Sequence, residues 1–244
     1  EKVVGLDCRE GCIVGIQTKQ SRYPAKTVVL ATGGATYPLT GSTGDGYLMV
    51  SQLGHAIVPL RPALVPLIVK EIDLADSMQG VSLMHVRMTA FACPAEKINI
   101  NLIPPYETGR GIRSKKPSAP ILENRQGEMM MTHFGIGGPI TLLMSLSIVD
   151  ALERGPVSVS IDLKPALSLK QLQERLQRDF NQHGKRTFRR IMSDVVPHKM
   201  VEPLIGLSGV DGERPANQIS AAERDKIAII LKSLRFNIVK SLPM

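Results

Sequence analysis

The chain has 244 residues, of which 43% are hydrophobic, and a formal net charge of +8 at pH 7. This apolar content can form the core of one large domain or of two smaller ones. The longest apolar segment, 136–152, is interrupted by two glycines, a proline and an aspartate, so it is shorter than the roughly 20 apolar residues of a membrane-spanning helix. We therefore expect a globular protein that has no membrane partner.

The cysteine and histidine pattern argues against a metal site. Three cysteines (Cys8, Cys12 and Cys93) and five scattered histidines do not supply the four clustered nitrogen and sulfur ligands of a structural zinc site. The odd cysteine count and the C-x3-C spacing fit a reducing compartment, so we expect a cytoplasmic protein. Cys8 and Cys12 are either ordinary strand and turn residues or a redox pair.

The first 58 residues combine β-rich segments with glycine turns. Strands are predicted at 3–6, 12–18 and 27–30. Glycines then cluster before a helix predicted over 45–53, which Gly54 would end. Such a turn lets the backbone approach a ligand and offers helix N–H groups to anionic oxygens. A sharp structural turn is the alternative.

The middle of the chain is predicted to be mainly β-structure. Strand patterns at 64–69, 82–93 and 97–102, joined by short links, indicate a barrel or a curled sheet. A basic, proline-rich loop over 104–120 follows. Next come a strand that ends at Thr132-His133, a glycine turn in which Thr132 pins the backbone, and a helix with Pro139 in its first turn. Another strand is predicted at 157–163.

Residues 165–234 carry helical patterns. Ser168-x-x-Gln171 and Ser220-x-x-Glu223 are capping boxes, and each precedes apolar residues at helical spacing. Two shorter helices between them are separated at Pro197. The tail 235–240 alternates apolar and polar residues, which predicts a strand that returns to the barrel and makes the helices an insertion within it.

Three ordered blocks of sequence resemble a known family. They are G-G-A-T-Y-P-L-T-G-S-T-G-D-G-Y at 33–47, L-V-P-L at 64–67 and G-E-M-M-M-T-H-F-G-I at 127–136. They are similar to the HI0933/YhiN-like family of bacterial FAD-dependent, NAD(P)-linked oxidoreductases, which are two-dinucleotide-fold flavoproteins. The resemblance implies a multi-domain α+β fold: a partial FAD-binding α/β domain and an inserted β-barrel that carries a helical subdomain.

The resemblance also implies domain boundaries and cofactor contacts. We expect a partial FAD-binding domain at 1–58, the barrel at 59–164 and 235–244, and the helical subdomain at 165–234. NAD(P)H is the expected electron donor. The residues expected beside FAD belong to the A-T-G-G and T-G-D-G motifs and their approach: Ala31, Thr32, Gly33, Gly34, Ser42, Thr43, Gly44, Asp45 and Gly46.

One departure from the family concerns the pyrophosphate-binding turn. Such flavoproteins hold the FAD pyrophosphate at a G-x-G-x-x-G turn, but here Gly44-Asp45-Gly46 is followed by Met49 in place of the third glycine. The sequence begins at Glu1 and lacks the late glycine-rich segment of the family. We therefore expect an internal fragment of a flavoenzyme that is inactive alone, and whether it retains flavin stays open.

Other polar residues are candidates for chemistry. His133 is a candidate acid or base because imidazole titrates near neutral pH, although a histidine at a strand end can also be structural. Thr43 and Asp45 fit a helix N-cap as well as a cofactor contact. Glu71, Asp73 and Asp76 are expected to form a solvated turn.

Two basic clusters could meet the phosphates of RNA or of a nucleotide, or could form a solvated face. The clusters are Arg110, Arg113, Lys115 and Lys116, and Lys185, Arg186, Arg189 and Arg190.

From this sequence we expect a flavoprotein oxidoreductase of unknown small-molecule substrate, with the insert covering the flavin and shaping the substrate pocket. The alternatives are an RNA-acting flavoenzyme or nucleic-acid-binding module, and a structural barrel without redox activity.

Overall fold

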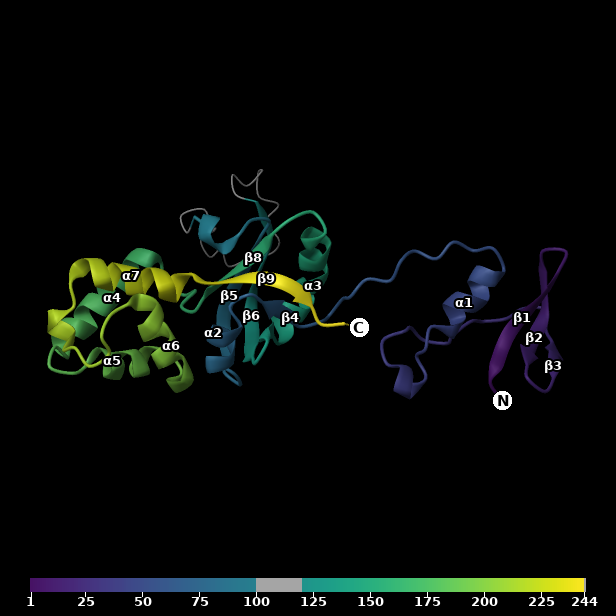
Figure 1. Ribbon diagram of the computed structural model, residues 1–244, viewed down its shortest axis with the longest axis horizontal. Helices are drawn as coiled ribbons and strands as arrows, with labels where there is room; N and C mark the ends of the chain where they lie inside the picture. Colours follow the sequence, from purple (N-terminus) through teal and green to yellow (C-terminus); the bar gives the residue numbers. More distant parts are fainter. Residues whose placement is uncertain (100–119, 244) are drawn as a thin grey trace. The chain divides into compact units, whose positions relative to one another are not determined.

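The computed structural model describes residues 1–99 and 120–243. The chain divides into unit 1, residues 1–61, and unit 2, residues 62–243 (Figure 1). The first basic cluster, with Arg110, Arg113, Lys115 and Lys116, lies outside the described residues, as does most of the predicted loop over 104–120.

Unit 1 begins with an antiparallel sheet in the order β1 (Val3–Arg9), β2 (Cys12–Thr18) and β3 (Arg22–Pro24). A short 3-10 helix, η1 (Pro38–Thr40), and α1 (Asp45–Gln52) follow. Gly54, just beyond α1, has a φ of 89°, which only glycine adopts easily. The predicted helix and its glycine end are confirmed.

The strand predicted at 27–30 is wrong. These residues have no regular secondary structure, and the Val29 side chain is 85% exposed. A strand exists only where a neighbour completes its hydrogen bonds, and the one sheet of unit 1 is β1-β2-β3. An apolar β-branched run is therefore not sufficient to make a strand here.

Unit 2 contains a closed antiparallel barrel in the order β4-β7-β6-β5-β8-β9. The barrel closes because β4 pairs with both β7 and β9. The mixed α/β fold with a barrel and helices is thus confirmed. The strands are β4 (Leu67–Val69), β5 (Ser82–Phe91), β6 (Ile121–Thr132), β7 (Gly135–Gly137), β8 (Val157–Asp162) and β9 (Leu234–Ser241).

The strand predicted at 97–102 is not found in the described residues. Instead η2 (Ala95–Lys97) forms a 3-10 turn, residues 98–99 have no regular structure, and 100–102 lie outside the described residues. The peptide N–H of Ala95 donates to the side-chain Oδ1 of Asn237 over 2.8 Å. This bond connects the turn to β9, so the turn is held by a side-chain contact and not by the hydrogen bonds of a β-strand.

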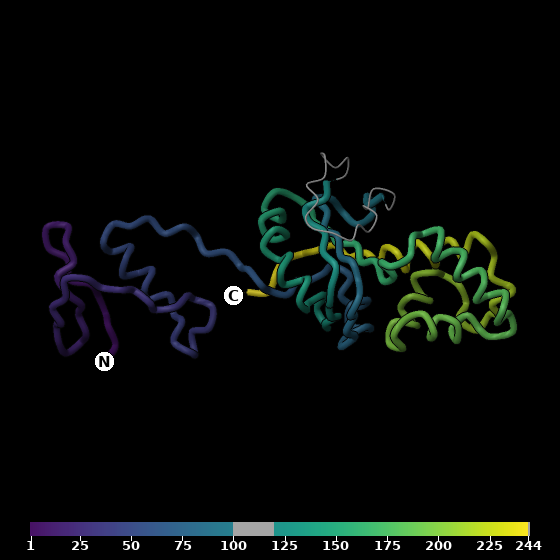
Figure 2. The backbone as a smooth tube through the Cα atoms, turned by 180° about the vertical axis from the view of Figure 1, so that it is seen from behind, coloured from purple at the N-terminus to yellow at the C-terminus, as the bar shows by residue number. Residues whose placement is uncertain are grey.

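The chain leaves the barrel after β8, forms four α-helices, and returns to the barrel at β9. Figure 2 shows both connections running side by side into the helical segment. Both predicted capping boxes are present, at the starts of α4 and α7. The helices of unit 2 are α2 (Ile72–Ser77), α3 (Pro139–Leu152), α4 (Leu169–Gln182), α5 (Phe188–Val195), α6 (His198–Ser208) and α7 (Ala221–Lys232), with a short 3-10 helix, η4 (Ala216–Gln218).

The acidic stretch at 71–76 is not the solvated turn that the sequence suggests. Asp73 and Asp76 lie in α2, which Glu71 precedes. The Glu71 carboxylate accepts from the backbone N–H of Asn237 over 2.9 Å and from its side-chain Nδ2 over 2.8 Å. Glu71 therefore anchors α2 to strand β9, because its two oxygens satisfy donors that the barrel leaves open.

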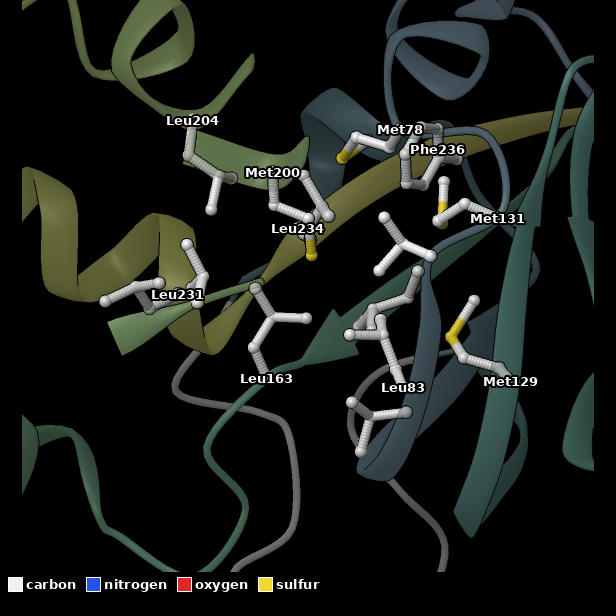
Figure 3. Close-up of a cluster of buried hydrophobic side chains, with 14 of the residues drawn as sticks. Met78, Leu83, Met129, Met131, Leu163, Met200, Leu204, Leu231, Leu234 and Phe236 are labelled. Carbon is white, nitrogen blue, oxygen red and sulfur yellow. The ribbon is translucent and has the colours of Figure 1, made fainter. Parts of the chain in front are cut away.

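One apolar core runs from the barrel into the helical segment. Figure 3 shows Met78, Met131 and Phe236 on the barrel side, and Met200 and Leu204 of α6 on the helical side. Methionine side chains adapt to irregular spaces, which suits the curved interior of a small barrel. Because the core is continuous, the helices share their stabilisation with the barrel.

A buried ion pair lies where the helical segment starts and ends. The Lys232 ammonium, 12% exposed, lies 2.5 Å from the Asp162 carboxylate, 6% exposed. It also donates to the carbonyl oxygens of Lys164 and Leu167, over 3.1 and 2.6 Å. The two connections are thus joined by polar contacts that are largely buried.

We expect Asp162→Asn to destabilise unit 2 by about 3–5 kcal/mol, because it leaves the Lys232 ammonium buried without a counter-charge. Lys226→Met, on the exposed face of the same helix α7, is the control and should change stability by less than about 0.5 kcal/mol. Urea unfolding followed by circular dichroism at the helix band measures both. Equal stability of the two variants would contradict the role of the ion pair.

Candidate functional site

The two glycine motifs of unit 1 contact each other. The Gly44 N–H donates to the Gly34 carbonyl over 3.1 Å, which joins the T-G-D-G turn to the A-T-G-G segment. Gly33 and Gly44 have φ values of 73° and 80°, where a side chain would strain the backbone. The motifs therefore form one compact turn at the start of α1.

Gly46 lets helix α1 approach Thr32. A Cβ atom built on Gly46 would lie 2.2 Å from the Thr32 Oγ1, far closer than van der Waals contact allows. A Cβ on Gly33 would likewise lie 3.1 Å from the Ser42 Oγ. These glycines let the two motifs pack closely against each other, and a contact between them and a cofactor stays a prediction.

A cavity of about 530 Å³ lies beside this turn, within unit 1. Of the nine predicted cofactor residues, four line it: Ala31, Thr32, Thr43 and Asp45. The other five, Gly33, Gly34, Ser42, Gly44 and Gly46, are not on its lining. The opposite wall is apolar and comes from strands β1 and β2, with Val3, Leu6 and Ile16.

Asp45 provides an anionic group on the cavity wall. Its carboxylate Oδ2 lies 2.7 Å from the Lys2 ammonium. Hydrogen bonds from Lys2 and Thr43 hold the pKa of Asp45 below its usual value. Asp45 also sits in the first turn of α1, where the helix dipole favours negative charge. It is thus a ready acceptor for a ligand hydroxyl.

Lys2 was missed by the sequence reasoning. A single lysine near a strand start has no spacing that marks it as functional. Its place becomes apparent only when β1 folds beside the glycine turn and Lys2 joins the cavity lining.

His133 belongs to unit 2, where it lies in the turn between β6 and β7. Its side chain is exposed, and its ring packs edge-on against Phe134, with 4.9 Å between ring centroids. The Thr132 Oγ1 accepts from the Gly135 N–H over 3.1 Å, so the predicted pinning of this turn by Thr132 is confirmed. A catalytic role for His133 stays a prediction.

The second basic cluster is partly neutralised by acidic neighbours. Arg186 lies 2.8 Å from Asp194, and Arg189 lies 2.7 Å from Glu213 and also pairs with Glu202. The Arg189 pairs join α5 to α6 and to the segment after it, and the Arg186 pair joins α5 to the segment before it. Lys185 and Arg190 are the exposed members of the cluster.

Comparison with protein families identifies this architecture. The model described as "HI0933-like protein barrel and H2TH domain" matches residues 118–244, more than half of the chain. The chain belongs to the HI0933-like family. The resemblance seen in the sequence is thus confirmed. Two of its three motif blocks, at 33–47 and 64–67, lie upstream of the matched region.

Two curated relatives of this HI0933-like chain are enzymes. The chain is 25% identical over 214 residues to a 3-dehydro-bile acid delta(4,6)-reductase of Clostridium scindens, a match that covers 85% of the chain and 44% of the relative. It is 27% identical over 203 residues to a ribosomal RNA dihydrouridine synthase of Haemophilus influenzae, which covers 83% and 41%. The chain thus spans less than half the length of either relative.

The cysteines of the HI0933-like chain are all free thiols. Cys12 lies opposite Arg9 and Cys8 opposite Ile13 in the β1–β2 pairing, so the two cysteines do not face each other. Burial raises the pKa of Cys93, which makes its thiol less reactive. Within residues 1–99 and 120–243, no three His, Cys, Asp or Glu side chains are grouped so that they could hold a metal ion.

In the part of the chain that the structure describes, none of the helices has the length and apolar character needed to cross a membrane.

Gly46→Ala should destabilise α1 and the turn before it. Alanine normally stabilises a helix relative to glycine by about 0.8–1.0 kcal/mol, but here overpacking against Thr32 should reverse the sign, at a cost of about 1–3 kcal/mol. Amide hydrogen exchange of α1 measures the effect.

Gly206→Ala in α6 is the matched control, because a Cβ there meets nothing within 4 Å. It should be neutral or stabilising. Adding Thr32→Ala to Gly46→Ala should restore part of the lost protection. If Gly46→Ala protected α1 as well as glycine does, the close packing of the two motifs would be disproved.

Proposed function

We propose that this chain is the partial cofactor-binding unit and the barrel of an FAD-dependent oxidoreductase. The observation that carries the proposal is the contact between the A-T-G-G and T-G-D-G motifs, which places the Asp45 carboxylate on the wall of a cavity. Membership of the HI0933-like family supports it. So do the names of the two relatives, a reductase and a synthase of a dihydro product.

The residues present fit part of a flavin nucleotide. Pockets for drug-sized ligands measure about 300–1,000 Å³, and FAD is larger than such ligands, so a cavity of about 530 Å³ suits a portion of it. Asp45 would accept a hydrogen bond from a sugar or ribityl hydroxyl. The hydroxyls of Thr32 and Thr43 would donate to ligand oxygens, and the apolar wall from β1 and β2 would cover a flat ring.

The proposed reaction is the reduction of a carbon–carbon double bond. The names of both relatives describe the loss of such a bond, in a bile acid derivative and in uridine. The reduction would use two electrons drawn from NAD(P)H: one carbon would receive a hydride equivalent, and the other carbon would receive a proton. When bound, FAD supplies the hydride or electron transfer. Unit 2 would provide substrate contacts, with His133 as the candidate proton donor.

The test is the ultraviolet-visible spectrum of the natural full-length protein, recorded beside that of the 244-residue chain. We expect flavin absorbance in the former that bleaches on addition of NAD(P)H, and weak or no absorbance in the latter. Asp45→Asn should weaken flavin retention about tenfold or more, because a hydrogen bond to a charged group is lost.

Asp7→Asn is the matched control in the same unit, because Asp7 lies 3.8 Å from the exposed Arg22 and is not on the cavity wall. It should retain flavin like the native protein. A colourless full-length protein that gains no absorbance on reconstitution with FAD would refute the proposal and favour a structural barrel without redox activity.

A second candidate is a reductase that acts on RNA. It is favoured by the relative named as a ribosomal RNA dihydrouridine synthase and by the exposed Lys185 and Arg190. Basic side chains neutralise phosphates and release counterions, so binding weakens steeply with salt. Arg110, Arg113, Lys115 and Lys116 belong to this proposal as further phosphate contacts.

For this candidate we expect a ribosomal RNA hairpin to bind at low salt and to dissociate at moderate salt in a gel-shift titration. Lys185→Ala with Arg190→Ala should reduce the slope of log affinity against log salt by about 1 to 2. Lys170→Ala with Arg178→Ala, exposed on α4, should leave it unchanged. Absence of any shift at low salt excludes the candidate.

A further inference from the structure

A second cavity lies between the barrel and the helical segment, within unit 2. Its volume is about 680 Å³, in the range of cavities that hold small organic ligands. Its walls come from the start of β5, the connection after β8, helix α4, and the junction of α5 with α6. Most of the lining is apolar and includes Leu83, Leu163, Leu167, Val195, Val196 and Met200.

The wall from β5 is irregular. The β5–β6 pairing shifts between Leu83 and Val86, so Met84 and His85 form a bulge on the cavity lining. Bulges redirect side chains and are frequent beside functional sites. Figure 3 shows Leu83, Leu163 and Met200 pointing toward the same region from three different segments.

The charged side chains of the lining are all basic. Lys164 and Arg175 line the cavity together with His85, and no aspartate or glutamate is among the described residues of its wall. The Lys164 ammonium is half-buried, and it has no hydrogen bond or ion pair with any residue that the structure describes. Arg175 lies 3.7 Å from Asp179, one turn further along α4, and Asp179 is not on the cavity lining.

The positive charges of Lys164 and Arg175 repel each other at the cavity wall. Burial lowers the pKa of Lys164, and the charge of Arg175 lowers it further. A half-buried ammonium beside a second cation is costly unless an anion shares the site. The protein supplies no such anion on the described wall, so the missing charge is one that a ligand can bring.

We propose that this cavity binds an amphipathic anion, with its apolar body against Leu83, Leu167 and Met200 and its acidic head group between Lys164 and Arg175. The site belongs to unit 2 alone. It is independent of the flavin proposal, and either can fail without the other.

The shape and lining distinguish this ligand class from other anions. A small inorganic anion would leave the apolar walls in contact with water. A single-stranded nucleic acid would need aromatic side chains for its bases to stack on, and no aromatic ring other than His85 lines the cavity among the described residues. An apolar body that carries one acidic group satisfies both halves of the wall.

Isothermal titration of the complete 244-residue chain tests the proposal, with dodecanoate, dodecyl phosphate, dodecanol and inorganic phosphate as probes below micelle-forming concentrations. We expect at least one of the two acidic dodecyl probes to bind more tightly than dodecanol, and inorganic phosphate to bind weakly. Which acidic probe binds better distinguishes a carboxylate head group from a phosphate.

Two variants and a control assign the binding to this cavity. Lys164→Met should weaken the acidic probe about tenfold or more, because a charge-assisted hydrogen bond is lost, and leave dodecanol unchanged. Ala166→Trp, at an exposed position on the wall, should abolish binding of both probes by filling the cavity. Lys170→Met, at an exposed site on α4, should change neither. Circular dichroism checks that each variant is folded.

The proposal is overturned if the acidic probes do not bind, if dodecanol binds as tightly as they do, or if Lys170→Met weakens binding as much as Lys164→Met. Displacement of the bound acidic probe by inorganic phosphate or by a short RNA at similar concentrations would also overturn it. That result would identify a general anion or nucleic-acid site in place of an amphipathic one.

Discussion

The buried pair of Asp162 and Lys232 is the contact on which the arrangement of unit 2 depends. It lies at the single place where the helical segment starts and ends, and the Lys232 ammonium also binds the carbonyl oxygens of Lys164 and Leu167. The backbone N–H of Leu163 donates to the carbonyl of Leu231 over 2.9 Å beside it. These bonds position the backbone of Lys164, so its side chain is presented at the cavity between barrel and helices.

A buried ion pair contributes more to specificity than to stability. Removing two charges from water costs several kcal/mol, and a well-packed apolar pair can be equally stable. The apolar core supplies the stability, because it runs without a break from the barrel into α4, α6 and α7. That core would tolerate small shifts of one segment past the other. The directional bonds of Lys232 to three oxygens do not, and they select one alignment of the two connections.

Local patterns in the sequence predicted the elements whose stability is local. The capping boxes and apolar spacing of α4 and α7 describe structure that neighbouring residues determine. The strand predicted at 27–30 failed because a strand depends on a partner. Glu71 was misjudged because its partner Asn237 is 166 residues away in the chain. In the candidate site, the glycine turn before α1 was predicted from its residues, whereas Lys2 reaches Asp45 only through the fold.

The net charge of +8 shows why composition alone does not locate a binding site. Arg186 and Arg189, which appear in the sequence as a basic cluster, are paired with acidic side chains, and the Arg189–Glu202 pair joins α5 to α6. Lys164 and Arg175 are eleven positions apart and form no cluster in the sequence, yet they meet at an apolar cavity. Solvent and counterions readily satisfy an exposed cation, but a half-buried one depends on its immediate neighbours. Burial and pairing, which only the folded chain reveals, therefore decide which positive charges are available to a ligand.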